Sequence, residues 1–391
     1  MAKTTTVSPM RALLAEAIRR QPQLLELATG LVLRESPSDD KGAVDACMDL
    51  AAFHALGVGG RVTRHVQAGF GDVLELRFGP QRVGPETRIL LLGHLDTVWP
   101  MGTLEKMPCR VAPDGDGAER LWGPGTLDMK VGVAMALTAI ELLAASRGLE
   151  REIVLLLNSD EEVGSPVSRP ITERLARECG AVYVLEPAQG LAYKTNRKGT
   201  GNWRLEVQGL AAHAGVDFTR GRSAVLELMR LIEKVSGWTD LERGTTVNVG
   251  VIGGGTKTNV IPAEAWAEVD VRVARRADGP RMETRFAGLK ASKAGGCRLT
   301  VEGGINRPPM ERTPGTVGLF RRARKLAAEL DLELTEAGTG GASDGNFTSA
   351  LGIATLDGMG AVGEGAHAAH ESVLIAHLAP RTALLAGMLA G

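Results

Sequence analysis

The sequence predicts an α/β protein, in which a catalytic domain with a mostly parallel sheet is interrupted by a smaller α+β lid or dimerisation domain. Apolar runs of strand length alternate with amphipathic helical stretches in the first half of the chain, as in parallel βαβ units. Near residue 198 this pattern gives way to strands of alternating apolar residues, and it returns after about residue 306. The length of 391 residues also exceeds that of one ordinary domain.

The first catalytic segment, residues 1–197, is expected to open with two amphipathic helices, over about 10–34 and 42–56. The run "TRILLLGHLDTV" (87–98) is densely apolar, which is typical of a strand covered on both faces. The elements expected after it alternate between helix and strand: a helix over 128–148, a strand over 151–160, a helix over 169–180 and a strand over 181–187. This order predicts a largely parallel sheet.

The inserted domain, residues 198–306, shows one long helical pattern over 222–238 among its strands. In "AEAWAEVDVRV" (263–273) alternate residues are apolar, which predicts a sheet with one wet face and helices on the other. The second catalytic segment, residues 307–391, completes the predicted catalytic domain. It is expected to contain a helix over 315–334, a glycine-rich loop over 338–346, a strand over 353–360 and a terminal helix.

Charge and composition exclude several function classes. The chain has 45 basic and 46 acidic side chains and a net charge of -1, so no global field favours nucleic acid or an anionic membrane. Arginines at 11, 19 and 20 interrupt the apolar stretches near the N-terminus. The apolar runs elsewhere are expected to be too short to span a bilayer. We therefore expect a soluble, cytoplasmic protein without nucleic-acid or membrane partners.

The four cysteines are widely scattered and form no CxxC pair, a pattern typical of reduced thiols. Any metal site must therefore use histidine and carboxylate ligands. Five such side chains stand at or just after the ends of predicted strands: His94, Asp96, Glu161, Glu162 and Glu186. Ligands bind at the carboxyl ends of the strands in open α/β sheets, so we expect these residues to gather on one rim.

Two further candidates lie outside the strands. Asp128 opens a predicted helix, and His367 lies in the late loop "GEGAHAAHES". Taken singly, each candidate has an ordinary explanation: Asp128 could be a helix N-cap, and Glu186 before Pro187 could be a surface turn. Taken together they favour a metal site, because so many acids on one rim repel each other unless cations neutralise them.

Seven motifs also occur in a familiar order: "GHLDTV", "GPGTLDMKVG", "NSDEEVGS", "LEP", "AAHAG", "TNVIP" with "VDVR", and "GAHAAHES". In order and spacing the chain resembles the aminoacylase, acetylornithine deacetylase and succinyl-diaminopimelate desuccinylase family of zinc metallopeptidases. It is most similar to the glutamate carboxypeptidase branch, of the glucarpidase type. The resemblance covers essentially the full length and implies two Zn²⁺ ions per chain.

The resemblance implies a role for each residue of the rim. His94 and Glu186 would hold one ion, Glu162 and His367 the other, and Asp128 would bridge both. Asp96, two residues after His94 on the same side of the strand, would orient the imidazole ring. Glu161 would be the general base. An extended backbone here would point Glu161 and Glu162 to opposite sides, so that each has its own task.

Substrate-binding residues are implied in the inserted domain. His213 would act across a homodimer interface and donate to the oxyanion of the tetrahedral intermediate. Asn259 and Arg272 would together hold the substrate α-carboxylate, for which a planar guanidinium is suited. The ordinary alternatives are a structural histidine beside a glycine turn, and an arginine on the solvated face of a strand.

Two other residues bear on specificity. Lys194, eight residues after Glu186, matches the family's cation for a glutamate γ-carboxylate, although Arg197 and Lys198 lie in the same stretch. Gly341, with Gly340, belongs to a loop that allows positive φ and close approach to substrate, and Asp344 in that loop could be an ordinary turn residue.

The sequence therefore predicts a dinuclear zinc hydrolase that removes a C-terminal amino acid, most favourably glutamate, from an N-acyl amino acid or short peptide. An N-acyl amino acid deacylase is the closest alternative, since the same metal rim would serve it. A non-catalytic binding relative is a third possibility, which predicts a missing ligand or base, whereas every expected position is filled.

Overall fold

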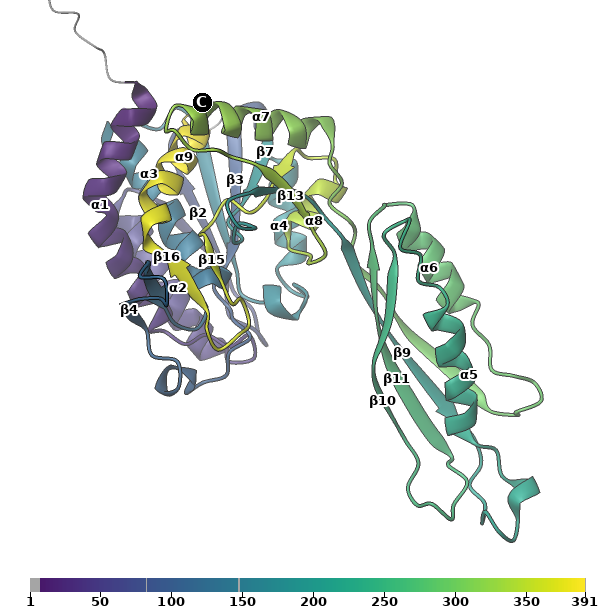
Figure 1. Ribbon diagram of the computed structural model, residues 1–391. Helices are drawn as coiled ribbons and strands as arrows, with labels where there is room; N and C mark the ends of the chain where they lie inside the picture. The colour runs from purple at the N-terminus through teal and green to yellow at the C-terminus, as the bar shows by residue number, and fades with distance from the viewer. Residues whose placement is uncertain (1–7, 82, 147, 391) are drawn as a thin grey trace, which may run out of the picture. The chain divides into compact units, whose positions relative to one another are not determined.

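The structure, a computed structural model, describes residues 8–81, 83–146 and 148–390, and these divide into two compact units. The first unit comprises the chain up to Asn196, Arg312–Gly338 and the part from Ser343 onward, and the second comprises Arg197–Glu311 with Thr339–Ala342 (Figure 1). The second unit thus ends five residues later than the predicted insertion. It also takes in part of the glycine-rich loop, which the sequence assigned to the catalytic domain.

A mixed sheet forms the centre of the first unit. Its described strands, in spatial order, are β1 (Arg61–His65), β2 (Val73–Phe78), β6 (Glu152–Asn158), β3 (Arg88–His94), β7 (Ala181–Val184) and β14 (Thr355–Leu356). The pairs β6–β3, β3–β7 and β7–β14 are parallel, and the pairs β1–β2 and β2–β6 are antiparallel. The predicted mostly parallel sheet is confirmed, while β1 and β2 were not anticipated.

Helices cover both faces of this sheet. One face packs against α1 (Pro9–Val32), α2 (Lys41–Gly57), α3 (Val131–Ser146), α7 (Pro314–Ala328) and α9 (Leu378–Leu389). The other faces α4 (Arg169–Arg177), with α8 (Gly345–Ala350) beside it. Successive residues alternate between the two cores, so that Leu91 belongs to the first and Leu90 to the second. This explains why the strand reads as continuously apolar.

The helical stretch Thr126–Ser146 corrects one expectation about length. By length and composition it could cross a membrane, contrary to the prediction that the apolar runs are too short. Its 18-residue apolar window is 78% buried inside the structure. Burial between the sheet and its neighbouring helices α1 and α9 accounts for the apolar composition.

The first unit also has a smaller antiparallel sheet that the sequence did not predict. Its described strands, in spatial order, are β15 (Gly363–Glu364), β16 (Ser372–Leu374), β5 (Glu119–Trp122) and β4 (Arg110–Pro113). The loop between β15 and β16 contains His367. Another pair joins β8 (Tyr193–Arg197) to β13 (Glu336–Thr339).

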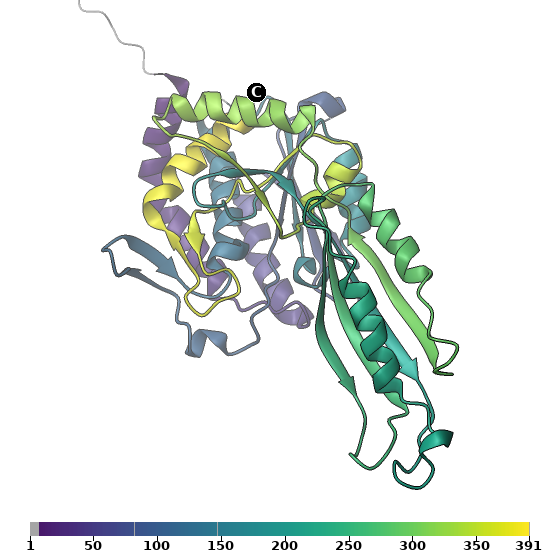
Figure 2. The ribbon, with the colours of Figure 1, turned by 45° about the vertical axis from the view of Figure 1, so that its right-hand side comes forward.

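The second unit is an antiparallel sheet with helices on one face (Figures 1 and 2). Its described strands, in spatial order, are β10 (Thr246–Gly254), β11 (Glu264–Val273), β9 (Gly199–Gln208) and β12 (Arg298–Arg307). Two helices, α5 (Ala224–Ser236) and α6 (Asp278–Ala287), cover the apolar face. The predicted α+β character holds, but α6 was missed. Its Phe286 stacks on Trp203 with ring centroids 4.2 Å apart.

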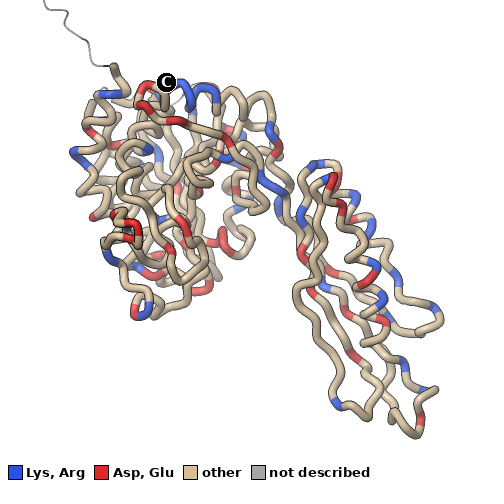
Figure 3. Tube along the Cα trace, in the orientation of Figure 1, with Lys and Arg blue, Asp and Glu red and all other residues tan. Residues whose placement is uncertain are grey.

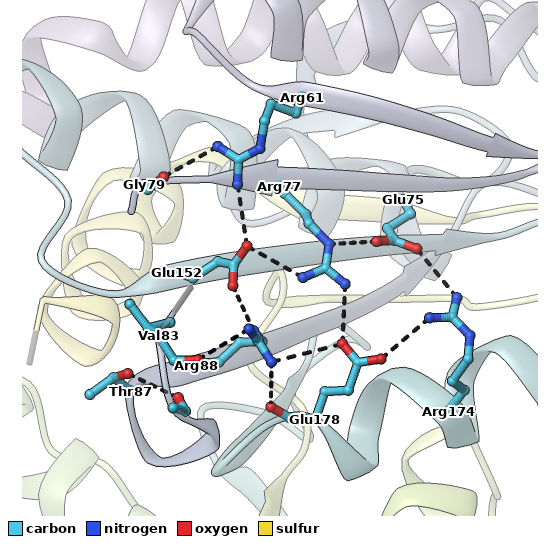
Figure 4. Close-up of polar contacts among 11 residues, drawn as sticks. Arg61, Glu75, Arg77, Gly79, Val83, Thr87, Arg88, Glu152, Arg174 and Glu178 are labelled. Carbon is cyan, nitrogen blue, oxygen red and sulfur yellow. Dashed lines mark hydrogen bonds and ion pairs between the residues drawn. The ribbon is translucent and has the colours of Figure 1, made fainter. Parts of the chain in front are cut away.

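Charged residues of both signs are interspersed along the trace of each unit, as Figure 3 shows. One buried group of them lies where β3 and β6 begin, at the end of the sheet away from His94 (Figure 4). There Glu152, only 3% exposed, accepts from Arg61 (3.2 Å), Arg77 (3.3 Å) and Arg88 (2.6 Å). One carboxylate thus joins arginines from three neighbouring strands.

Replacing this carboxylate should destabilise the first unit. We expect Glu152→Gln to lower the free energy of unfolding by about 2 kcal/mol at pH 7. This is less than the cost of breaking a fully buried ion pair, because the arginines are partly exposed to solvent. Burial raises the pKa of Glu152, but the hydrogen bonds from Arg88 and Arg77 outweigh it and lower the pKa. The difference from wild type should therefore shrink as the pH falls below about 4.5. Urea unfolding at pH 7 and pH 4 checks this, and a difference that grows in acid contradicts it.

Candidate metal centre

Asp128 lies between the two predicted histidine ligands. Its Oδ1 is 3.2 Å from His94 Nε2, and its Oδ2 is 3.4 Å from His367 Nε2. The two oxygens of one carboxylate therefore face two different imidazoles. This is the arrangement expected of a carboxylate that bridges two cations.

Each of the two histidines also has a predicted glutamate ligand near it. Glu186 Oε1 is 3.8 Å from His94 Nε2, and Glu162 Oε2 is 3.3 Å from His367 Nε2. Ligand atoms of His94, Glu161 and Glu186 all lie within 4.8 Å of one another, and so do those of His94, Asp128 and Glu162. The structure thus brings the sequence-predicted metal ligands together, and Glu161 stands beside them.

The ring of His94 has the orientation that a metal ligand needs. Its Nδ1 donates to the backbone carbonyl of Asp96 at 3.0 Å, and a carbonyl can only accept. In the neutral ring Nε2 therefore carries the lone pair, and Nε2 is the nitrogen that faces Asp128 and Glu186. The donor set of imidazole nitrogens and carboxylate oxygens fits zinc and similar divalent ions.

The histidines and acids perturb one another strongly. Burial lowers the pKa of His94, but hydrogen bonds to Asp128 and Asp96 outweigh it and raise the pKa well above its usual value. Hydrogen bonds to Asp128 and Glu162 raise the pKa of His367 to about 10. Burial raises the pKa of Glu162. The raised pKa values of both histidines favour their protonated forms in the metal-free protein, which offset part of the charge of the acids.

Metal binding should therefore release protons at neutral pH, since a coordinating imidazole must be neutral. We expect the affinity for each ion to rise by about tenfold per pH unit through the neutral range, because the metal-free histidines hold their protons there. Calorimetric titration of the metal-free protein with Zn²⁺ in buffers of different ionisation enthalpy measures the released protons. A pH-independent affinity without proton release would contradict this charge balance.

The backbone at Asp128 differs from the expected helix start. Asp128 (φ -117°, ψ 93°) and Met129 have non-helical dihedral angles, and α3 begins only at Val131. The Asp128–Met129 peptide bond is cis. Asp128 is therefore no N-cap of α3. The sequence assigned no role to Glu371, whose carboxylate accepts from the Asp128 N–H at 3.1 Å. Its position four residues after His367, within the same motif, was the available signal.

The two adjacent glutamates are not extended, contrary to the expectation. Glu161–Val163 forms a 3₁₀ turn, which separates successive side chains by about 120° rather than placing them on opposite sides. The amides of Glu161 and Glu162 donate to the two carboxylate oxygens of Asp96, at 3.2 and 3.1 Å. Asp96 Oδ1 is also 3.4 Å from His94 Nδ1, farther than the Asp96 carbonyl. Asp96 thus fixes both glutamates as well as the ring.

Two more acids support this turn from behind. Asp160, fully buried, accepts from the N–H groups of Val167 (2.7 Å) and Ser168 (3.3 Å). The sequence gave Asp160 no task, and its contacts show that it shapes the loop after the glutamates. Asp344 is 3% exposed and accepts from Asn158 at 2.6 Å, so it is not a solvated turn residue.

Comparison with known proteins agrees with this geometry. The model of peptidase family M20/M25/M40 matches residues 90–391, which is most of the chain. The chain belongs to this family. It is accordingly a metallopeptidase or amidohydrolase, as the sequence motifs predicted.

Three relatives illustrate the similarity. Carboxypeptidase G2 of Pseudomonas sp. (strain RS-16) is 28% identical over 380 residues, covering 95% of this chain and 90% of that protein. Succinyl-diaminopimelate desuccinylase of Delftia acidovorans is 28% identical over 310 residues, covering 75% and 78%. The crystal structure of aminopeptidase PepT from Bacillus cereus superposes with a TM-score of 0.77 at 21% identity, covering 95% of this chain and 98% of that one. The last likeness confirms the fold of the M20 family.

Two of the substrate residues expected in this M20 chain lie together in the second unit. His213 is exposed, and its Nδ1 accepts from the N–H groups of Gly215 (3.1 Å) and Val216 (3.2 Å). The neutral ring must then carry its proton on Nε2, so Nε2 can donate a hydrogen bond. The next residue, Ala214, donates its N–H to the carbonyl of Asn259 at 3.0 Å.

Arg272 and Asn259, which are predicted to hold the substrate α-carboxylate together, lie far apart within one chain. Asn259 precedes the start of β11, at Glu264, whereas Arg272 lies near its other end. Arg272 lies eight residue steps along the strand from Glu264, a distance of about 26 Å. One chain therefore cannot place both side chains on one carboxylate. Arg272 pairs with Asp270 instead, with Nε–Oδ1 and Nη2–Oδ2 distances of 2.9 Å.

The remaining specificity candidates, Lys194 and Gly341, belong to different units. Lys194, on β8 in the first unit, is 7% exposed and its backbone pairs with that of Asp357. Gly341 belongs to the second unit, where its carbonyl accepts from Arg197 at 3.4 Å. Neither Gly340 nor Gly341 is among the described glycines with positive φ, so this loop does not use the backbone freedom that glycine allows.

Proposed function

We propose that this M20 enzyme is a dinuclear zinc hydrolase that cleaves the amide bond to a C-terminal amino acid, with glutamate as the preferred residue. The observation that carries the dinuclear site is Asp128, whose two oxygens face His94 and His367 separately. The full-length similarity to carboxypeptidase G2 supports the carboxypeptidase reaction. The substrate would be an N-acyl amino acid or a short peptide.

Glu161 would act as the general base and then as the acid. Its carboxylate lies within 4.8 Å of ligand atoms of both His94 and Glu186, so a water molecule at the centre would be within its reach. Glu161 would take a proton from the attacking water and pass it to the leaving amine nitrogen. Ions bound at the centre would supply a lowered water pKa and a polarised carbonyl.

His213 would stabilise the oxyanion, since its Nε2 carries the proton and Nδ1 is occupied by two backbone donors. Because Asn259 is tied to the His213 loop, we propose that both serve the site of a partner subunit, while Arg272 serves its own chain. The edge strand β10 exposes Val251 (48%) and Ile252 (65%), which favours pairing of two copies there.

His213→Ala should lower kcat by about 10²–10³-fold with metal still bound, because one oxyanion donor is lost. Mixing His213→Ala with Glu161→Gln chains tests the action across subunits. A mixed dimer restores one complete site, so an equal mixture that exchanges subunits should recover about a quarter of wild-type activity. No recovery after proven exchange, or a loss of less than a few-fold in His213→Ala alone, would contradict the role.

Substrate profiling tests the reaction itself. Release of free glutamate from an N-aroyl-glutamate should exceed hydrolysis of acetylornithine or succinyl-diaminopimelate by about tenfold or more in kcat/KM. Replacing Lys194 by Ala should then reduce hydrolysis of glutamate substrates more than that of neutral ones, and an equal loss would remove Lys194 from the specificity pocket. Comparable or greater activity on the acyl diamino acids would instead favour the deacylase alternative, which the similarity to the desuccinylase supports.

The cytoplasmic location expected from the N-terminal arginines stays a proposal. The segment 1–7 lies outside the described residues. A reporter fused to the C-terminus of the chain, followed by cell fractionation, would test this location.

A further inference from the structure

Glu371 is a buried carboxylate at the edge of the metal centre. It is 1% exposed and lies between His367 and β16. Its Oε1 accepts from the N–H groups of Leu127 (2.9 Å) and Asp128 (3.1 Å). Its Oε2 accepts from the Gly125 N–H (2.9 Å) and from Trp99 Nε1 (2.8 Å). Four donors thus converge on one side chain.

Three of these donors belong to the backbone segment that carries Asp128. Buried N–H groups need acceptors, and the non-helical angles at Asp128 and Met129 keep this segment out of the regular bonds of α3. Glu371 supplies the missing acceptors. Its own backbone carbonyl accepts from the Gly123 N–H at 3.2 Å, which ties the start of the same segment to the hairpin of His367.

The fourth donor, Trp99, lies in the segment that follows β3. Trp99 comes three residues after Asp96, whose carboxylate holds Glu161 and Glu162. Glu371 therefore connects the segment of Asp128, the hairpin of His367 and the loop that continues from His94. These are the segments that carry the two histidine ligands and the carboxylate between them.

We propose that Glu371 is a positioning residue that fixes the backbone of Asp128 so that its two oxygens face His94 and His367. This inference rests on the metal-binding role proposed for Asp128. Glu371 acts through Asp128 and is itself no ligand, because its two oxygens are occupied by four N–H donors.

The chemistry requires a carboxylate at this position. A carboxylate offers lone pairs on both oxygens and can accept four hydrogen bonds, whereas a glutamine offers one oxygen and an NH₂ group. In Glu371→Gln the NH₂ group must face either the Gly125 and Trp99 donors or the Leu127 and Asp128 donors. Two buried donors then lose their acceptor with almost no change of side-chain volume.

Zn²⁺ affinity of the metal-free, full-length protein tests this inference, measured by competition with a chelator of known affinity. Glu371→Gln should weaken Zn²⁺ binding by about 10- to 100-fold, as when other groups that orient metal ligands are removed. Excess Zn²⁺ should restore part of kcat. Glu152→Gln is the matched control, because it removes an equally buried carboxylate at the other end of the sheet.

The proposal is overturned if Glu371→Gln binds Zn²⁺ within about twofold of wild type, or if Glu152→Gln loses as much affinity. If Glu371→Gln does not fold, Trp99→Phe decides the question, since it removes one of the four donors and leaves the backbone bonds. A loss of about threefold or more supports the role, and an unchanged affinity refutes it. Asp128→Ala in the same titration tests the premise separately: retention of both ions there refutes the metal-binding role proposed for Asp128, on which this inference rests.

Discussion

Glu161→Gln is expected to bind two metal ions as tightly as the wild type and to lose about 10²–10⁴-fold in kcat. The amide fills the same space as the carboxylate but cannot accept a proton from the attacking water. The turn should be unaffected, because Asp96 holds Glu161 through its backbone N–H rather than through its side chain. Metal analysis together with steady-state kinetics on an N-acyl glutamate gives both quantities.

The neighbouring Glu162→Gln is the matched comparison. It occupies the same 3₁₀ turn and is held by the same carboxylate of Asp96, but its side chain contacts His367 at 3.3 Å. We expect this variant to lose metal affinity first and activity as a consequence. If Glu161→Gln lost metal and Glu162→Gln did not, the two roles would have to be exchanged.

Asp128→Ala is expected to abolish activity and to lower the affinity for both ions. Each Asp128 oxygen faces a different histidine, at 3.2 and 3.4 Å, so one substitution removes a ligand from both positions. With less metal bound, the negative charges of the remaining acids would also be less neutralised, and the acids would repel one another more strongly. Stoichiometry by elemental analysis after dialysis measures the effect, with Glu152→Gln as the control for a buried acid outside the site.

Loss of one ion alone in Asp128→Ala would show that Asp128 serves a single metal. The ion that remains would then be held by its own histidine and glutamate, without a bridging carboxylate. Unfolding measured in the metal-free state separates this outcome from a general loss of structure, because both wild type and variant then lack the ions.

Three of the ligands could be predicted because each belongs to a short motif at or just after a strand end: His94, Glu162 and Glu186. His94 and Glu186 end or follow parallel neighbours in the sheet, so the topology alone brings them to one edge. The position of His367 could not be predicted from the topology of this sheet. It lies on a hairpin of the smaller sheet, whose strands of two to four residues carry little periodic signal.

The errors have a common physical cause, namely hydrogen bonds between segments distant in the chain. The backbone at Asp128 departs from helix where Glu371 accepts its N–H groups, and the turn at Glu161 is held by Asp96. Neither acceptor can be read from local propensity. The separation of Asn259 from Arg272 has a different cause, namely the length of β11, a strand that the alternating run over 263–273 had predicted.

The inserted unit gives the metal centre a further property. Glu162 and His367 flank the whole insertion in the sequence, so a single ion held by both would close a loop of about 200 residues. Because this link forms only in the folded state, the bound ion stabilises that state relative to the unfolded chain. The ion would then help to keep the C-terminal segment docked on the sheet, and its removal should make that segment the first site of proteolytic cleavage.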